Sequence, residues 1–228
     1  MTQIMTATEM EMTDGQIENA VGKLRDAMRK HRSGITSDVA QQVLGVENLG
    51  MVMFTPFRER AEVLSNLIVR KVKVNRLLTP QQVLDATGRK QYTNRKVVNA
   101  MPRGEGGGEG DETEVVFFKP EPWEYTRPDF MSDDDFEKAL GRRNLKSAPP
   151  DDVAAVNEAD PAFADTRPNG THWKDADGKW CFAAFCRWGG GRRVGVRRGD
   201  VRGWADLWWF AGLRLPDGKA GKSSGLRT

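Results

Sequence analysis

Residues 186–214, CRWGGGRRVGVRRGDVRGWADLWWFAGLR, combine glycine, arginine and tryptophan in a way that is typical of neither a core strand nor a flexible linker. From Val194 onward the segment alternates with period two. The even-numbered positions carry valines, tryptophans and charged residues, which can build strands, aromatic anchors and salt bridges. The odd-numbered positions point to the opposite side of a strand, and their residues share no size, charge or polarity. The segment therefore predicts a strand-and-loop surface with a scaffold side and a chemically arbitrary side.

Composition indicates a soluble globular protein. The chain has 228 residues, of which 38% are hydrophobic and 29% charged, enough for one large or two small domains. The formal net charge of +3 requires neither nucleic acid nor an anionic membrane as a partner. We expect no membrane span and no secretory signal, so a cytoplasmic location is the default, with surface display by an unconventional route left open.

The two cysteines do not indicate a redox or metal site. Cys181 and Cys186 are too few for a disulfide framework and do not form a CxxC motif. If their segment is a strand, the odd spacing places them on opposite faces, where they cannot bond to each other.

Residues 1–103 are expected to form a helical N-terminal domain. Apolar residues in 17–28 recur at spacings of three and four, and Asp14 is expected to cap that helix. Further helices are expected through SDVAQQVLG and through residues 57–75, FRERAEVLSNLIVRKVKVN. This half is the expected place for a homo-oligomer contact.

The turn chemistry of residues 79–111 adds two expectations. Thr79 should cap a short helix that has Pro80 at its first position. Residues 104–111, GEGGGEGD, should form a Gly/Glu-rich linker or loop. A phosphate-binding loop is disfavoured there, because no Lys-Ser or Lys-Thr pair follows and the glutamates would repel phosphate.

Residues 112–216 are expected to form a second domain, followed by a flexible tail at 217–228. A strand is predicted through TEVVFFK, and Ser132 should cap a helix whose three aspartates suit the positive helix end. Asp177 and Gly178 predict a hairpin turn between two extended aromatic stretches. The same DADG is a poor calcium loop because the third liganding position and the distant glutamate are missing.

No catalytic or metal-binding arrangement emerges from the chain. His31 is expected at a helix end, and His172 is expected among aromatic side chains. Neither belongs to a Ser/His/Asp or Cys/His pattern, so we expect no enzyme activity, no metal and no cofactor.

The frames GTHWKDADGKWCFAAFxRW and WxDxWWFAGLR resemble the variable proteins of diversity-generating retroelements. In those systems a template repeat is copied into the gene with errors at adenines, so AAC codons are favoured targets. Every residue on the odd-numbered face can be written with a codon ending in C that is reached from AAC by changing the two adenines. The resemblance implies a C-type-lectin-like domain, so the expected fold class is α+β, with antiparallel strands after the helical domain.

The resemblance also implies roles for individual residues. The candidate ligand-binding variable positions are Cys186, Gly189, Gly190, Gly191, Arg193, Gly195, Arg197, Gly199, Val201, Gly203, Ala205 and Leu207. The residues implied to hold the fold are Trp188, Val194, Val196, Trp204, Trp208, Trp209 and Phe210. The calcium motifs of sugar-binding lectins are absent from the sequence, so calcium-dependent sugar binding is not implied.

These features together predict a display protein that binds a macromolecular ligand without catalysis. The displayed set is expected to be cationic and to suit an acidic protein surface or a polyanion; its arginines are Arg192, Arg193, Arg197, Arg198 and Arg202. Nucleic-acid binding is the alternative, because arginine and tryptophan interleave here and TPQQVLDATGRKQYTNRKVV is a candidate helix-turn-helix fragment.

Overall fold

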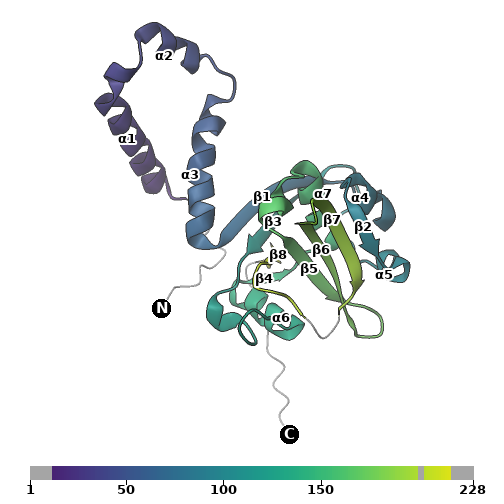
Figure 1. Ribbon diagram of the computed structural model, residues 1–228. Coiled ribbons are helices and arrows are strands. Elements are labelled where there is room, and N and C mark those ends of the chain that lie inside the picture. Colours follow the sequence, from purple (N-terminus) through teal and green to yellow (C-terminus); the bar gives the residue numbers. More distant parts are fainter. Residues whose placement is uncertain (1–11, 200–202, 217–228) are drawn as a thin grey trace. The chain divides into compact units, whose positions relative to one another are not determined.

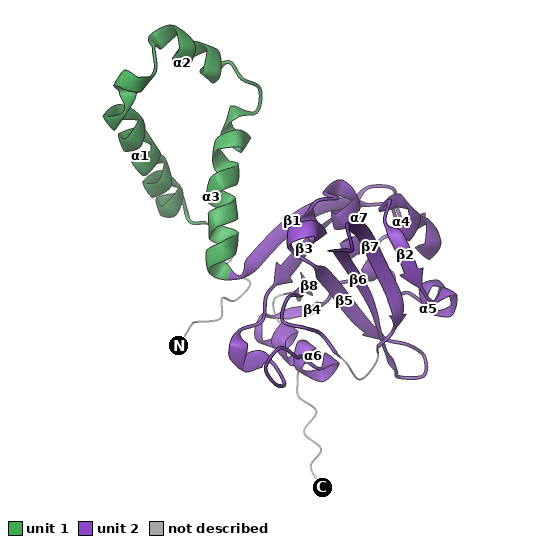
Figure 2. Cartoon of the chain, in the orientation of Figure 1, with its two compact units in different colours: residues 1–65 green, residues 66–228 purple. Residues whose placement is uncertain are grey.

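The computed structural model describes residues 12–199 and 203–216 (Figure 1). The expected tail at 217–228 and the candidate position Val201 lie outside the described residues. Within the described ranges, no helix is both long and apolar enough to cross a membrane. The chain divides into two compact units, Met1–Ser65 and Asn66–Thr228, which are coloured separately in Figure 2.

The first unit is helical. It contains α1 (Asp14–Lys30), the 3-10 turn η2 (Arg32–Gly34), α2 (Ser37–Leu44) and α3 (Leu49–Ser65). The cap of α1 is Thr13 rather than the expected Asp14, because the Thr13 hydroxyl accepts a hydrogen bond from the backbone N–H of Gln16 in a reciprocal capping box. Within this unit, none of the described apolar side chains is fully buried.

The second unit is an α+β structure around an eight-stranded mixed sheet. The strands are β1 (Leu67–Val74), β2 (Lys90–Thr93), β3 (Asp111–Phe118), β4 (Leu145–Ser147), β5 (Asn169–Lys174), β6 (Trp180–Trp188), β7 (Gly191–Arg198) and β8 (Trp209–Arg214). Their order is β1-β3-β8-β5-β6-β7-β2, and β4 also pairs with β8. Most pairs are antiparallel, as expected, but β2 with β7 and β5 with β8 are parallel.

Helices cover the two faces of the sheet unequally. One face carries the main core and is covered by α4 (Pro80–Ala86), α5 (Arg95–Asn99), α7 (Pro150–Ala159) and α8 (Phe163–Thr166). The other face is covered at one end by α6 (Asp133–Arg142), which follows the 3-10 turn η3 (Pro122–Glu124). There Phe136 packs against Phe118, Trp204 and Phe210. Over the rest of this second face, formed by β6 and β7, no helix of the described residues lies, and this area holds the pocket described below.

The expected helix over residues 57–75 is wrong in its second half. α3 ends at Ser65, and LIVRKVKV forms β1, which pairs with β3 along its whole length. Four of these eight residues are β-branched, which favours a strand that another strand can pair. Because β1 belongs to the sheet, the units divide between Ser65 and Asn66 and not at the expected boundary near residue 103.

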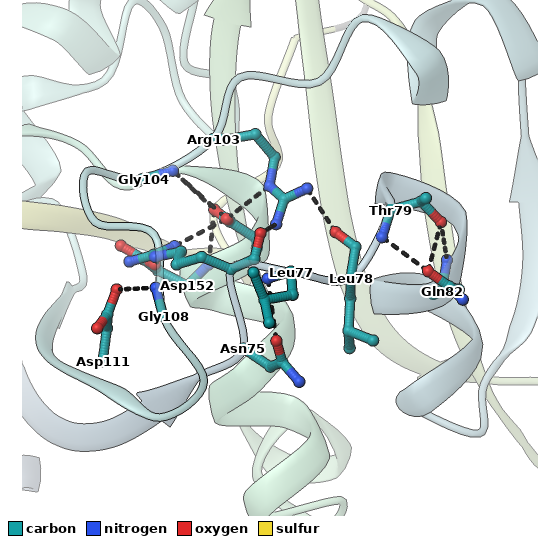
Figure 3. Close-up of polar contacts among 12 residues, drawn as sticks. Asn75, Leu77, Leu78, Thr79, Gln82, Arg103, Gly104, Gly108, Asp111 and Asp152 are labelled. Atoms are coloured by element: carbon teal, nitrogen blue, oxygen red, sulfur yellow. Dashed lines mark hydrogen bonds and ion pairs between the residues drawn. The ribbon is translucent and has the colours of Figure 1, made fainter.

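Residues 104–111 do not link two domains. They lie within the second unit, between α5 and β3, and a buried ion cluster holds the loop (Figure 3). The fully buried Asp151 accepts hydrogen bonds from Arg76 at 2.7 Å and Arg103 at 2.9 Å, and from the backbone N–H of Gly104 at 3.2 Å. Arg76 also pairs with Asp152, so a glycine-rich loop is tied to the start of α7.

Several local expectations are confirmed. Thr79 forms a capping box with Gln82, and Pro80 opens α4. Ser132 caps α6 by accepting from the N–H of Asp135. Asp177 and Gly178 lie in the turn between β5 and β6, whose strands pair antiparallel.

Candidate functional site

A pocket of about 420 Å³ lies over the face of the sheet that the helices leave open. It is built from β6 and β7, from β2 at the sheet edge, and from residues 203–208. Asp133 at the start of α6 also reaches it. Its lining residues are Tyr92, Asp133, Phe182, Ala184, Cys186, Trp188, Arg193, Gly195, Arg197, Gly199, Gly203, Trp204 and Trp208.

Strand register explains which side chains reach the pocket. In the β6–β7 pair Phe182 lies opposite Arg197, Ala184 opposite Gly195, and Cys186 opposite Arg193. Alternate residues point to opposite faces, so Val194 and Val196 face the main core, where neither is exposed. The period-two pattern of β7 thus separates pocket residues from core residues.

Six of the twelve candidate variable positions line the pocket: Cys186, Arg193, Gly195, Arg197, Gly199 and Gly203. Gly189, Gly190 and Gly191 lie at the connection from β6 to β7 and are exposed. Ala205 is half-buried and Leu207 is exposed, both in the segment before β8. The structure therefore brings half of the set together around one cavity.

Some candidate glycines are not free to change. Gly203 has a φ of +54°, and a Cβ added there would lie 2.5 Å from the carbonyl oxygen of Met131. Gly189 and Gly190 also have positive φ, at +59° and +80°, which strains any side chain that replaces hydrogen. Gly191 has open space, and a Cβ at Gly195 would make ordinary contacts. The backbone therefore favours exchange at Gly191 and Gly195 over the other three.

Four of the seven implied scaffold residues are buried, two are half-buried and one is exposed. Val194, Val196 and Phe210 are fully buried and Trp204 nearly so, while Trp208 and Trp209 are half-buried. Trp188 is wrong as a core residue, because its side chain is 68% exposed at the end of β6 and borders the pocket. Trp188 shares the parity of Phe182 and Cys186 on β6, so it lies on the pocket face of the sheet and not on the core face.

The arginines of the expected cationic cluster lie on both faces of the sheet, because successive residues of β7 point to opposite faces. Arg187 and Arg192 both bind Asp165, and Arg198 binds Asp175 and Asp177. The hydrogen bond from Arg192 lowers the pKa of Asp165, because it stabilises the charged form of the carboxylate. These three arginines are thus partly neutralised outside the pocket. Arg202 lies outside the described residues.

Arg193 and Arg197 face the pocket over aromatic rings. The guanidinium carbon of Arg193 lies 5.1 Å from the centre of the Tyr92 ring, and that of Arg197 lies 5.5 Å from the centre of the Phe182 ring. Both distances fall in the range of cation–π contacts. Among the described residues, no carboxylate forms an ion pair with either arginine, so the pocket presents two cations that no described carboxylate neutralises.

The aromatic wall of the pocket is anchored by a polar chain whose central member, His172, is buried. The indole N–H of Trp204 donates to Oδ1 of Asp133 at 3.0 Å, and the same oxygen lies 2.8 Å from Nδ1 of His172. Nε2 of His172 lies 2.7 Å from Oε1 of Glu137, and the ring stacks between Phe136 and Trp180. His172 is therefore buried among aromatics, as expected, and fixes the carboxylate that orients Trp204.

The pocket lining contains one thiol, that of Cys186. Cys186 is half-buried, and burial raises the pKa of its thiol, so it is not an activated thiolate. Cys181 lies on the buried face of β6, opposite to the face of Cys186. The described residues contain no group of three or more His, Cys, Asp or Glu side chains arranged to hold a metal ion.

Sequence reasoning missed several lining residues. Phe182 and Ala184 share the parity of Cys186 on β6, so the alternation that was applied to β7 would have found them. Tyr92 reaches the pocket because β2 pairs in parallel with β7 and places Tyr92 beside Gly195. Nothing near Tyr92 in the sequence signals that pairing.

Comparison of the chain with protein-family models, with curated proteins and with solved structures finds no match.

Proposed function

We propose that this chain is a ligand-binding display protein whose pocket residues are diversified by retroelement-templated adenine mutagenesis. The second unit corresponds, in this proposal, to a C-type-lectin-like variable domain. It binds a macromolecular target through the open face of the sheet and performs no catalysis.

One observation carries the proposal: the positions singled out as exchangeable alternate on β7 with valines that hold the core. Arg193, Gly195 and Arg197 contact the pocket, whereas Val194 and Val196 are fully buried. A surface tolerates new side chains when the contacts that stabilise the backbone are made by other residues. This arrangement separates recognition from folding within a single strand.

The decisive test of diversification is made on the gene. We expect an imperfect repeat of the codons for residues 186–214 near a reverse transcriptase gene, with differences only where the template has adenine. Differences spread evenly over all four bases, or the lack of any repeat, would contradict the proposal.

The displayed chemistry of this copy favours an acidic target. The two unneutralised arginines, Arg193 and Arg197, lie on the same strand with Gly195 between them, so they flank a shallow floor. Arginine in such a setting forms bidentate contacts with carboxylates. A protein surface with clustered Asp and Glu side chains fits this pocket.

A poly-glutamate peptide is a suitable probe of this charge preference. We expect it to bind the wild-type chain and to bind the Arg193→Ala/Arg197→Ala variant at least about tenfold more weakly, since each charged contact contributes about 1 kcal/mol or more. The matched control is Arg192→Ala/Arg198→Ala, which removes the same charge outside the pocket. Equal weakening in both variants would show that net charge, and not the pocket, attracts the peptide.

Nucleic-acid binding is the second candidate, favoured by the exposed indole of Trp188 beside two arginines on aromatic rings. The helix-turn-helix fragment is not supported, because strand β2 lies between α4 and α5 and joins the sheet. A steep loss of affinity for random-sequence DNA with added salt would favour this candidate. The lack of DNA binding in low salt would remove it.

A further inference from the structure

The helical first unit carries most of the exposed large hydrophobic side chains among the residues that the structure describes. Sixteen of the twenty-one exposed large hydrophobic side chains among the described residues lie within residues 12–64. In contrast, every buried hydrophobic residue in the described part of the chain is Ile68 or a later residue. Helices whose apolar side chains stay in water gain little stability, because packing of an amphipathic face supplies most of it. This unit therefore requires a partner surface.

Helix α1 carries the most regular of these surfaces. Ile17, Val21, Leu24 and Met28 recur at spacings of four, three and four, so they form one stripe along the helix. Their side chains are 43%, 53%, 43% and 55% exposed. The stripe runs from Ile17 to Met28, which is about 16 Å along the helix axis.

The charges of α1 are distributed unevenly between its two ends. Asp14 and Glu18 lie near its start, whereas Arg29 and Lys30 lie in its last turn. Two such helices side by side in antiparallel orientation place each acidic end against a basic end. Parallel pairing would place like charges together. The helix dipoles also oppose each other favourably in the antiparallel arrangement.

We propose that the apolar stripe of α1 is the dimerisation surface of this protein and that its occupant is α1 of a second copy in antiparallel orientation. Each copy buries Leu24 against the stripe of its partner, and the acidic first turn of each helix meets the basic last turn of the other. The proposal is independent of what the pocket binds. A dimer of this kind presents two pockets to one target and increases avidity.

Sedimentation equilibrium of the full chain over micromolar concentrations tests the stripe. The wild type should be a dimer, and Leu24→Glu should weaken dimerisation by at least about a hundredfold, because two buried leucines are lost per dimer. The matched control is Asn19→Glu, which adds the same charge away from the stripe and should leave the dimer unchanged. A monomeric wild type, or a Leu24→Glu dimer as tight as the wild type, would overturn the proposal.

Charge reversal at the two ends of α1 tests the orientation, and mixing the two variants controls for any loss of helix stability that the reversed charges cause. Asp14→Lys/Glu18→Lys makes both ends basic, and Arg29→Glu/Lys30→Glu makes both ends acidic. Each variant alone should dimerise more weakly than the wild type, whereas an equimolar mixture should form a heterodimer, which a misfolded chain cannot do. If either variant dimerises as tightly as the wild type, or if the mixture forms no heterodimer, the antiparallel pairing is wrong.

Discussion

Arg197 lies directly across the β6–β7 pair from Phe182, with its guanidinium carbon 5.5 Å from the centre of the Phe182 ring. The ring forms part of the pocket lining, and the arginine is held by this contact and by no carboxylate among the described residues. The neighbouring Val196 points to the other face and is fully buried. Of these two adjacent residues, Arg197 therefore lines the pocket, whereas Val196 packs in the core.

Substitution on the two faces of β7 should affect stability very differently. Val196→Ala should lower the free energy of unfolding by about 2 kcal/mol, because buried methyl groups are lost and a cavity remains. Arg197→Ala should cost less than about 1 kcal/mol, the size of an exposed cation–π contact. Urea unfolding of the two variants measures the difference. Equal costs would show that the pocket face is not separable from the core.

Gly203 should resist substitution, while Gly191 should accept it. Gly203→Ala places a Cβ 2.5 Å from the Met131 carbonyl oxygen at a positive φ, so we expect a loss of roughly 1–3 kcal/mol in the free energy of unfolding. Gly191→Ala meets no atom within 4 Å and should be nearly neutral. Thermal unfolding compares the two variants. Tolerance at Gly203 equal to that at Gly191 would contradict the backbone argument.

The buried ion cluster should be essential for the stability of the second unit. Asp151→Asn leaves Arg76 and Arg103 with one carboxylate fewer, and the imbalance of buried charge should cost about 3 kcal/mol. The control Asp165→Asn removes a carboxylate whose arginine partners are substantially exposed, and should cost about 1 kcal/mol or less. Denaturant midpoints, and protease cleavage within residues 104–110, report both effects. A smaller effect for Asp151→Asn than for the control would show that the cluster is dispensable.

Acid should destabilise the fold partly through Glu137. The hydrogen bond with His172 lowers the pKa of this carboxyl below its usual value of 4.5. A carboxyl with a depressed pKa in the folded state contributes stability above its unfolded pKa, and this contribution is lost as the pH falls through the folded pKa. We therefore expect the melting temperature to fall below about pH 4.5, with a shallower fall in Glu137→Gln. Parallel pH profiles of the two proteins would contradict this assignment.

The features that the sequence predicted correctly depend on residues close together in the chain. The capping box at Thr79, the cap at Ser132 and the turn at Asp177 and Gly178 each require only three or four neighbouring residues. The alternation along β7 is equally local, because a strand assigns successive side chains to opposite faces. Such local predictions agree with the folded structure because the contacts that produce them form within a single turn or strand.

Strand pairing and the burial of individual side chains depend on the tertiary structure. The helical apolar spacing of residues 61–68 continues past the end of α3, and pairing with β3 makes residues 67–74 a strand. Tyr92 enters the pocket through parallel pairing with β7, and Trp188 is exposed because it lies on the pocket face of β6 together with Cys186. Long-range pairing and burial depend on residues distant in sequence, so no local window contains them. The alternation of residues along β7 can thus be read from the sequence. Which of its two faces lines the pocket and which packs in the core depends on long-range strand pairing.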